Sequence, residues 1–184
     1  MAFMGGCTRN AGLLKSFGIT MRSDVFREVS SEEKTPAGYS ELSIYSSLKT
    51  RNPGIYLFDN SKRGTSDYVL LVNIDGQVAR IEGLLKEDKS VKFDDPEAGE
   101  GIKYMFQKNI LLQAGSHLLI IACPEDGIAI EKKIVLKDGT KNIILLKPQY
   151  GGVMSRSKPA IYGSGHNFIN GISGFSVWLN GEVL

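Results

Sequence analysis

The sequence has 184 residues, of which 42% are hydrophobic and 23% are charged. This composition is typical of one globular domain with short extensions, and the formal net charge of +2 argues against a nucleic-acid-binding protein, whose lysines and arginines form a basic stripe. No apolar run is long enough to span a bilayer. The two cysteines form no CxxC pair, which excludes a disulfide scaffold and a structural zinc site of the usual spacing.

Cys7 is the first candidate site. It follows the sequence FMGG, which resembles the end of a bacterial lipoprotein signal, where small residues precede the cysteine that receives the lipid. A complete signal also needs a basic start and an apolar stretch of about 7–15 residues. Lipid attachment at Cys7 therefore requires a gene start upstream of Met1. The alternative is an N-terminal linker with an incidental cysteine.

Residues 1–38 are expected to form a tether between such an anchor and the folded domain. One short helix is predicted inside it, because Asp24 can cap a helix on which Val25, Phe26 and Val29 share one face. Polar residues then interrupt this pattern before Tyr39. The folded domain is therefore expected to span residues 39–184.

Alternation of apolar and polar residues, the pattern of β-strands, dominates this domain. Strands are predicted over residues 39–48, 55–58, 68–74, 77–81, 102–112, 117–123, 128–136, 142–148 and 172–184. Turns rich in glycine separate the strands after residue 102 at intervals of about ten residues, which is typical of an antiparallel sheet. The predicted fold class is all-β, an antiparallel β-sandwich with few or no helices.

Asp75 and Gly76 lie between the alternating flanks of VNIDGQVARI, residues 72–81. An aspartate at this place could act as a catalytic or metal-binding carboxylate. Asp-Gly between two strand-like flanks is, however, among the strongest signals for a two-residue hairpin turn, because both residues tolerate positive φ. We therefore interpret Asp75 as a turn residue.

The acidic segment KEDKSVKFDDPEAGE, residues 86–100, is expected to be a solvated insertion between strands. Asp94, Asp95 and Glu97 in this segment are candidates for a ligand or partner surface, with calcium as one ligand to consider. The segment lacks the acidic spacing and the central glycine of an EF-hand loop, so no metal site is predicted. Residues 151–171, rich in Gly and Ser, are expected to be an extended connection.

Residues 68–148 resemble the PEGA type of bacterial surface β-domain. The residues that match are Val72, Ile74, Asp75 and Gly76 for the family's Asp-Gly turn, Ala114, Gly115, Ser116 and His117 for its Gly-x-His corner, and residues 128–136, Gly139 and 143–146 for its last two strands. The Pro-Glu-Gly-Ala start of that family is absent, and residues 86–100 are an insertion. The resemblance implies an immunoglobulin-like β-sandwich, a non-catalytic envelope module in which Gly115 and His117 are structural.

The histidines His117 and His166 are the main candidates for catalysis. Ser164 lies too close to His166 in the sequence to form a nucleophile with its base, and no P-loop, GxGxxG, HExxH or GxSxG motif is present. No cofactor is predicted, and the chain is not expected to be an enzyme. Trp178, in the terminal strand, is a further candidate for a ligand or partner surface, because tryptophan rings stack on sugars or anchor protein partners.

Together these features favour a non-catalytic lipoprotein of the bacterial cell envelope that binds a protein or a glycan. Exposed strand edges and loops would make the contact, above all residues 86–100 and 151–171. The membrane contact would be a lipid anchor only, with no nucleic acid as partner. The alternative is a carbohydrate- or calcium-binding accessory module, and a hydrolase is a weaker third hypothesis. Without an upstream signal the protein would be cytoplasmic.

Overall fold

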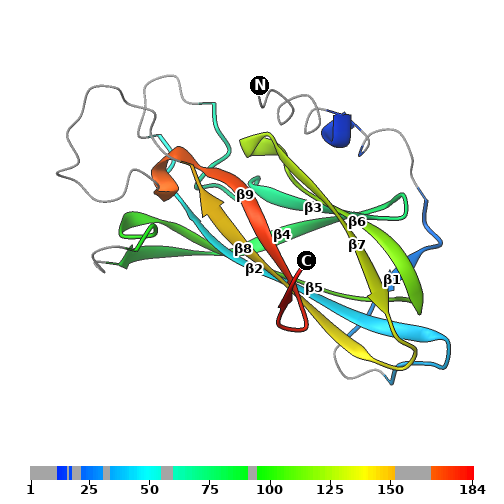
Figure 1. The fold of residues 1–184 in the computed structure, drawn as a ribbon. Helices are drawn as coiled ribbons and strands as arrows, with labels where there is room; N and C mark the ends of the chain where they lie inside the picture. Colours follow the sequence, from blue (N-terminus) through cyan, green and yellow to red (C-terminus); the bar gives the residue numbers. More distant parts are fainter. Residues whose placement is uncertain are drawn as a thin grey trace, which may run out of the picture.

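The computed structural model describes residues 12–15, 17, 22–30, 34–54, 60–90, 95–151 and 167–184. Nearly all of their regular structure is β, which confirms the predicted class (Figure 1). The elements are β1 Phe26–Glu28, β2 Tyr39–Thr50, β3 Val69–Ile74, β4 Gln77–Ser90, β5 Gly99–Gln113, β6 Gly115–Cys123, η1 Pro124–Asp126, β7 Ile128–Leu136, β8 Lys141–Tyr150, η2 Phe168–Asn170, β9 Ile172–Leu179 and β10 Glu182–Val183, where η denotes a short 3-10 helix.

The strands form one strongly curled sheet, a half-barrel (Figure 1). Their order is β10-β9-β8-β2-β5-β4-β3-β6-β7, with β1 added to β5. Two parts of the predicted fold are corrected. β2 and β8 run parallel, from Glu41 beside Lys141 to Ser46 beside Leu146, so the sheet is mixed rather than antiparallel. The described strands also belong to one continuous sheet instead of two stacked sheets.

β4 is the strand that connects the two sides of the curl. Its residues 77–82 pair with β3, and its residues 83–90 pair with β5. Gly83 lies where the partner changes, and a Cβ at this position would be 2.9 Å from the ring of Phe106. Glycine therefore permits the close approach of β4 to β5 at the point where the sheet changes direction.

The segment expected to be a helical part of the tether instead forms β1. Its residues 26–28 pair antiparallel with residues 110–112 of β5, beyond the point at which β4 leaves that strand. The side chain of Gln77 fixes the start of β1, because its Oε1 accepts hydrogen bonds from the backbone N–H groups of Val25 at 2.8 Å and Phe26 at 3.0 Å. Asp24 pairs with Arg22 and caps no helix. These tertiary contacts outweigh a weak helical pattern.

In the acidic segment 86–100, residues 86–90 and 99–100 belong to strands rather than to a separate insertion. β4 continues to Ser90 and β5 begins at Gly99, and the two strands pair from Lys86 beside Lys103 to Ser90 beside Gly99. The pairing extends through polar residues because it depends on backbone hydrogen bonds, which polar side chains do not prevent. Outside the described residues lie Cys7, Asp94, His166, the predicted strand 55–58 and most of the connection 151–171.

The core lies inside the curl and is built by alternate residues of the long strands. Tyr68, Tyr104 and Phe106 form its aromatic part, with ring centroids 5.0 Å apart for Tyr68 and Tyr104 and 5.6 Å apart for Tyr104 and Phe106. Tyr150 and Phe168 are buried as well. The intervening residues of the same strands point outward and form the outer face of the sheet.

Candidate functional site

Asp75 and Gly76 form the turn between β3 and β4. Their φ angles are 49° and 97°, the left-handed conformation that a two-residue hairpin turn requires. The turn also brings the Asp75 carboxylate to the start of β6. Its Oδ2 lies 2.7 Å from Nδ1 of His117, and its Oδ1 accepts a hydrogen bond from the backbone N–H of Leu118 at 2.8 Å. Asp75 therefore both shapes a turn and connects two hairpins.

Nδ1 of His117 is hydrogen-bonded to a carboxylate, as it would be in a catalytic histidine, but its second ring nitrogen is hydrogen-bonded as well. Nε2 lies 2.8 Å from the carbonyl oxygen of Gln113. Gly115, at φ 143°, allows the sharp turn that brings Gln113 and His117 together. A general base needs a ring nitrogen that can reach a substrate. Both nitrogens of His117 are bonded within the protein, although a polar hollow of about 430 Å³ lined by Arg22 and Ser116 lies beside the ring.

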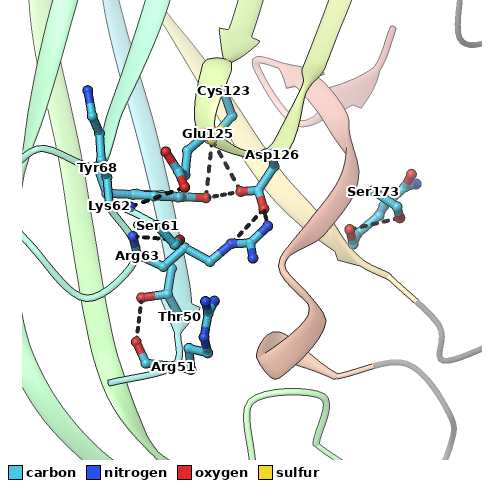
Figure 2. Close-up of polar contacts among 11 residues, drawn as sticks. Thr50, Arg51, Ser61, Lys62, Arg63, Tyr68, Cys123, Glu125, Asp126 and Ser173 are labelled. Atoms are coloured by element: carbon cyan, nitrogen blue, oxygen red, sulfur yellow. Dashed lines mark hydrogen bonds and ion pairs between the residues drawn. The ribbon is translucent and has the colours of Figure 1, made fainter. Parts of the chain in front are cut away.

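A second polar cluster joins the loop before β3 to η1 (Figure 2). Asp126 lies at its centre, with a side chain that is 1% exposed. Its Oδ2 accepts a hydrogen bond from the hydroxyl of Tyr68 at 2.5 Å. Its Oδ1 accepts from Nε of Arg63 at 3.0 Å and also from Nη2 of that residue. Figure 2 shows the thiol of Cys123 directed at Tyr68 and Asp126. Its Sγ lies 3.1 Å from the Tyr68 hydroxyl oxygen and 3.4 Å from Oδ2 of Asp126.

The chemistry of this cluster is structural rather than nucleophilic. Burial, with the Asp126 carboxylate nearby, raises the pKa of the Cys123 thiol from 9.0 to about 12. A reactive cysteine has a lowered pKa and a partly exposed sulfur, and Cys123 has neither. Gly171, between η2 and β9, lies against the ion pair, since a Cβ there would be 2.6 Å from Nη2 of Arg63. The cluster therefore holds the loop, η1 and the start of β9 together.

Lys49 forms the centre of a third cluster. Its side chain is 0% exposed, and its Nζ donates to Oδ2 of Asp88 at 2.7 Å and to the carbonyl oxygens of Glu97 at 2.9 Å and Gly99 at 2.5 Å. The ring of Phe168 lies 4.9 Å from the same nitrogen. The hydrogen bond from Lys49 lowers the pKa of Asp88 below its ordinary value of 3.8. All three donors of the ammonium are used, so Lys49 holds the end of the β4–β5 hairpin against β2.

Asp95 and Glu97, predicted as ligand residues, lie beside this third cluster. Oδ1 of Asp95 accepts a hydrogen bond from the backbone N–H of Glu97 at 2.9 Å. The Glu97 carboxylate accepts from the hydroxyl of Tyr150 at 2.6 Å and from Nζ of Lys103 at 3.0 Å. Within the described ranges, no group of three or more His, Cys, Asp or Glu side chains is arranged to hold a metal ion.

The outer face of the sheet carries apolar side chains across six neighbouring strands, β4 to β10 through β5, β2, β8 and β9. Cross-strand pairing places Leu84 beside Met105, Tyr45 beside Leu145, and Leu145 beside Trp178. Leu84 is 72% exposed and Met105 is 50% exposed. A contiguous exposed apolar surface is typical of an interaction site, whereas scattered residues are not. The residues of this surface, the outer apolar stripe, are Tyr45, Leu84, Met105, Ile143, Leu145, Trp178 and Val183.

A hollow of about 700 Å³ lies over the outer apolar stripe from Leu84 to Leu145. Val29, Leu84 and Met105 supply apolar surface to this hollow. Its charged groups are paired, Glu28 with Lys108 and Glu82 with Arg80. The hollow forms where β4 has left β5 and β1 has not yet joined it. It therefore depends on the same change of strand partners that curls the sheet.

Sequence reasoning identifies Trp178 but misses the rest of the outer apolar stripe. A signal for it is present. In IYSS and IILL, residues 44–47 and 143–146, apolar side chains occupy both faces of the strand. One face packs in the core, so an apolar residue on the opposite, solvent face indicates a contact with another molecule. The clusters around Lys49 and Asp126 have no comparable local signal, because their partners lie far apart in the sequence.

Comparison with protein-family models, with curated proteins and with solved structures gave no match. In the part of the chain that the structure describes, no helix is both long enough and apolar enough to cross a membrane. The geometry of these four sites is therefore the basis for a functional assignment.

Proposed function

We propose that this protein is a non-catalytic binding protein that docks a partner protein on its outer apolar stripe. The observation that carries the proposal is that six paired strands carry outward apolar side chains, which are direct cross-strand neighbours on β4–β5 and from β2 to β10. Across β2–β5, Tyr45 is opposite Gln107 and Met105 is opposite Ser47, so these two apolar side chains are diagonal neighbours. Exposed apolar surface is unfavourable in water, and docking would remove it. The stripe is held on a hydrogen-bonded sheet, so a partner can bind without ordering a loop.

The polar clusters support the non-catalytic part of the proposal, because each is bonded internally. His117 is engaged at both ring nitrogens, and the ammonium of Lys49 has three acceptors. The raised pKa of Cys123 keeps its thiol neutral. Each of these groups has a structural reason for its position, and none presents a free catalytic atom.

A glycan-binding module is the second candidate function, since Trp178 belongs to the outer apolar stripe. Nζ of Lys147, however, lies 4.1 Å from the centre of the Trp178 ring, so it covers a face on which a sugar would stack. This contact favours a protein partner. The calcium-binding alternative is weakened by Glu97, whose carboxylate is already bonded to Tyr150 and Lys103.

We place this binding function in the bacterial cell envelope, with a lipid on Cys7, because of the FMGGC sequence and the PEGA-like pattern of residues 68–148. Expression of the gene with its upstream region, followed by labelling with palmitate and cell fractionation, tests the location. We expect labelled protein in the membrane fraction and none for Cys7→Ser. Unlabelled cytoplasmic wild-type protein would contradict the location without affecting the binding function.

The binding function is tested by comparing two exposed sites. Tagged wild-type protein, Leu145→Lys in the outer apolar stripe and Val135→Lys outside it are incubated with envelope extract, and retained proteins are quantified by mass spectrometry. Leu145 is 38% exposed and Val135 is 67% exposed, so both variants should fold, which circular dichroism verifies. We expect Val135→Lys to retain the wild-type partner and Leu145→Lys to lose it. Equal retention by both variants would refute the proposal.

A further inference from the structure

His117 has a hydrogen-bond acceptor at each of its two ring nitrogens. Nε2 lies 2.8 Å from the backbone carbonyl oxygen of Gln113, which can only accept a hydrogen bond. Nδ1 lies 2.7 Å from Oδ2 of Asp75. A neutral imidazole carries a single N–H group and can therefore donate to only one of these two oxygens. Hydrogen bonds at both nitrogens thus require a second proton within the contact.

The surroundings favour this second proton on the ring over a proton on the carboxylate. Oδ1 of Asp75 accepts a hydrogen bond from the backbone N–H of Leu118 at 2.8 Å. The Asp75 side chain is also 31% exposed, compared with 9% for that of His117. Contact with solvent and hydrogen bonds accepted at both oxygens favour the ionised form of a carboxylate. The contact then consists of an imidazolium that donates from both nitrogens and a carboxylate that accepts.

A polar hollow lies on one side of the ring. The hollow of about 430 Å³ is lined by Asp75 and His117 and also by Arg22 and Asp24. The last two residues are paired with each other, with Nη2 of Arg22 at 2.8 Å from Oδ2 of Asp24. The hollow gives water access to the contact, so a proton can leave the ring for solvent while the protein stays folded.

β7 packs beside β6 and places the apolar Ile134 opposite His117. The lysines of β7 are directed elsewhere. Nζ of Lys132 donates to the carbonyl oxygen of Leu184, and Lys133 lies on the opposite face of the strand from Ile134, because neighbouring residues of a strand alternate. The pH response of the contact therefore depends on the ring and its carboxylate partner.

The β3–β4 turn, which carries that carboxylate, also holds the segment that precedes the sheet. The backbone N–H of Arg22 donates to the carbonyl oxygen of Gly76 at 3.3 Å. The side chain of Gln77 accepts from the backbone N–H of Phe26 at 3.0 Å and donates to its carbonyl oxygen at 2.9 Å. Residues 22–26 are therefore attached to the turn whose position the histidine contact fixes.

We infer that His117 is a pH-dependent switch, which holds the β3–β4 turn and the attached residues 22–26 against the corner between β5 and β6, and which releases them as the pH rises. When Nδ1 loses its proton to solvent, its lone pair faces the Asp75 carboxylate, and attraction becomes repulsion. Nε2 keeps its proton and its hydrogen bond to Gln113. The carboxylate then moves away from the ring and into the polar hollow. The switch contains no residue of the outer apolar stripe, so it goes beyond the proposed docking function.

Urea denaturation between pH 5.5 and pH 8.5 tests the contribution of the switch to stability. This contribution is present while both ring nitrogens are protonated and is lost as the pH rises. An imidazole in water loses its second proton at about pH 6.5, so the loss should occur above that pH. Relative to His117→Gln, which lacks the titrating ring, we expect the folding equilibrium constant of the wild type to fall by up to about tenfold per pH unit. His166→Gln removes the other histidine of the chain and is the matched control, which should behave as the wild type does.

Two measurements on the wild-type protein test the switch without relying on a variant. The ¹⁵N chemical shifts of the His117 ring at pH 7, where an imidazole in water is mostly neutral, should be those of a doubly protonated ring. Amide hydrogen-exchange protection of Val25 and Phe26, corrected for the intrinsic rate at each pH, should fall about tenfold between pH 6 and pH 8.5, whereas that of the core residue Ile44 should not change.

Three results would overturn the inference. The first is a His117 ring that carries a single proton at pH 7. The second is a wild-type stability profile that runs parallel to that of His117→Gln. The third is equal protection of Val25 and Phe26 at both pH values, which would show that residues 22–26 do not depend on the ring.

Discussion

The carboxylate of Asp75 lies 2.7 Å from Nδ1 of His117, although the two residues are 42 positions apart in the sequence. The contact joins the β3–β4 turn to the corner that begins β6. Because Nε2 of His117 also bonds to the carbonyl oxygen of Gln113, the ring bridges two hairpins and is not free for catalysis. The relationship explains why an aspartate, rather than any residue that tolerates positive φ, is suited to this turn.

Replacement of Asp75 by glycine separates its role in forming the β3–β4 turn from its hydrogen bonds to β6. Glycine adopts the observed φ of 49° readily, so the turn is preserved, whereas the hydrogen bonds to His117 and Leu118 are lost. We expect Asp75→Gly to lower the free energy of unfolding by about 2 kcal/mol, measured by urea denaturation. A double-mutant cycle with His117→Gln should show coupling between the two sites. An unchanged unfolding free energy in Asp75→Gly would mean that the residue is needed for the turn alone.

Removal of the charge on Asp88 leaves a buried ammonium without its counter-ion. Lys49 is fully buried, so we expect Asp88→Asn to cost about 3 kcal/mol at neutral pH. The matched control is Glu100→Gln, because Glu100 pairs with Lys89 in the same hairpin but both side chains are more than 60% exposed, at 66% and 68%. That variant should change the unfolding free energy by less than about 1 kcal/mol. Equal effects of the two substitutions would refute a structural role for the buried pair.

The same ion pair predicts a pH dependence. The pKa of Asp88 is lower in the folded protein than its ordinary value of 3.8, so its stabilising contribution is present above that pH and is lost as the pH falls through the folded-state pKa. Wild-type protein should therefore lose stability in acid more steeply than Asp88→Asn does. Unfolding free energies measured from pH 6 down to pH 2 would show this below the ordinary pKa of 3.8, and parallel profiles would contradict the assignment.

Gly171 is predicted to be intolerant of alanine. Its φ is +80°, and a Cβ would lie 2.6 Å from Nη2 of Arg63, against the ion pair with Asp126. We expect Gly171→Ala to cost at least about 3 kcal/mol, because it adds backbone strain and displaces a buried ion pair. Gly181→Ala is the control, since that residue has φ +90° and no atom of the described residues within 4 Å of a Cβ, and it should cost about 1–2 kcal/mol. Thermal denaturation of both variants is the measurement. The loss shared by the two variants reports backbone strain, and the additional loss in Gly171→Ala reports crowding of the Cβ against the ion pair.

Cys123 should resist thiol reagents in the folded protein. A pKa raised from 9.0 to about 12 lowers the thiolate fraction at pH 8 roughly a thousandfold, and the thiolate is the reactive form. In a Cys7→Ser background, where Cys123 is the remaining cysteine, we expect Ellman's reagent to react only after addition of guanidinium. Rapid modification of the native protein would show that the cluster around Asp126 is open to solvent.

Local chemistry determined the all-β class and the positions of the turns. Alternation of apolar residues and the Asp-Gly and Asn-Gly pairs act over two to four residues, so they are readable in the chain itself. Asp75 and Asn180, the non-glycine residues with positive φ in the described part of the chain, each precede a glycine for this reason. The same local reasoning predicted a helix at residues 25–29, where the distant side chain of Gln77 instead fixes a strand.

Only the tertiary structure decided which strands are neighbours and what each outward side chain meets. The parallel pairing of β2 with β8 and the burial of Lys49 depend on groups about 40 to 100 residues apart. The extension of β4 through residues 86–90 depends on partners in β5, from Lys86 beside Lys103 to Ser90 beside Gly99. The outer apolar stripe arises in the same way, because Tyr45, Leu145 and Trp178 become neighbours only once their strands are paired. Many different strand pairings have similar local free energies, so local sequence does not determine which strands pair. Burial of the apolar faces in the shared core inside the curl determines the pairing.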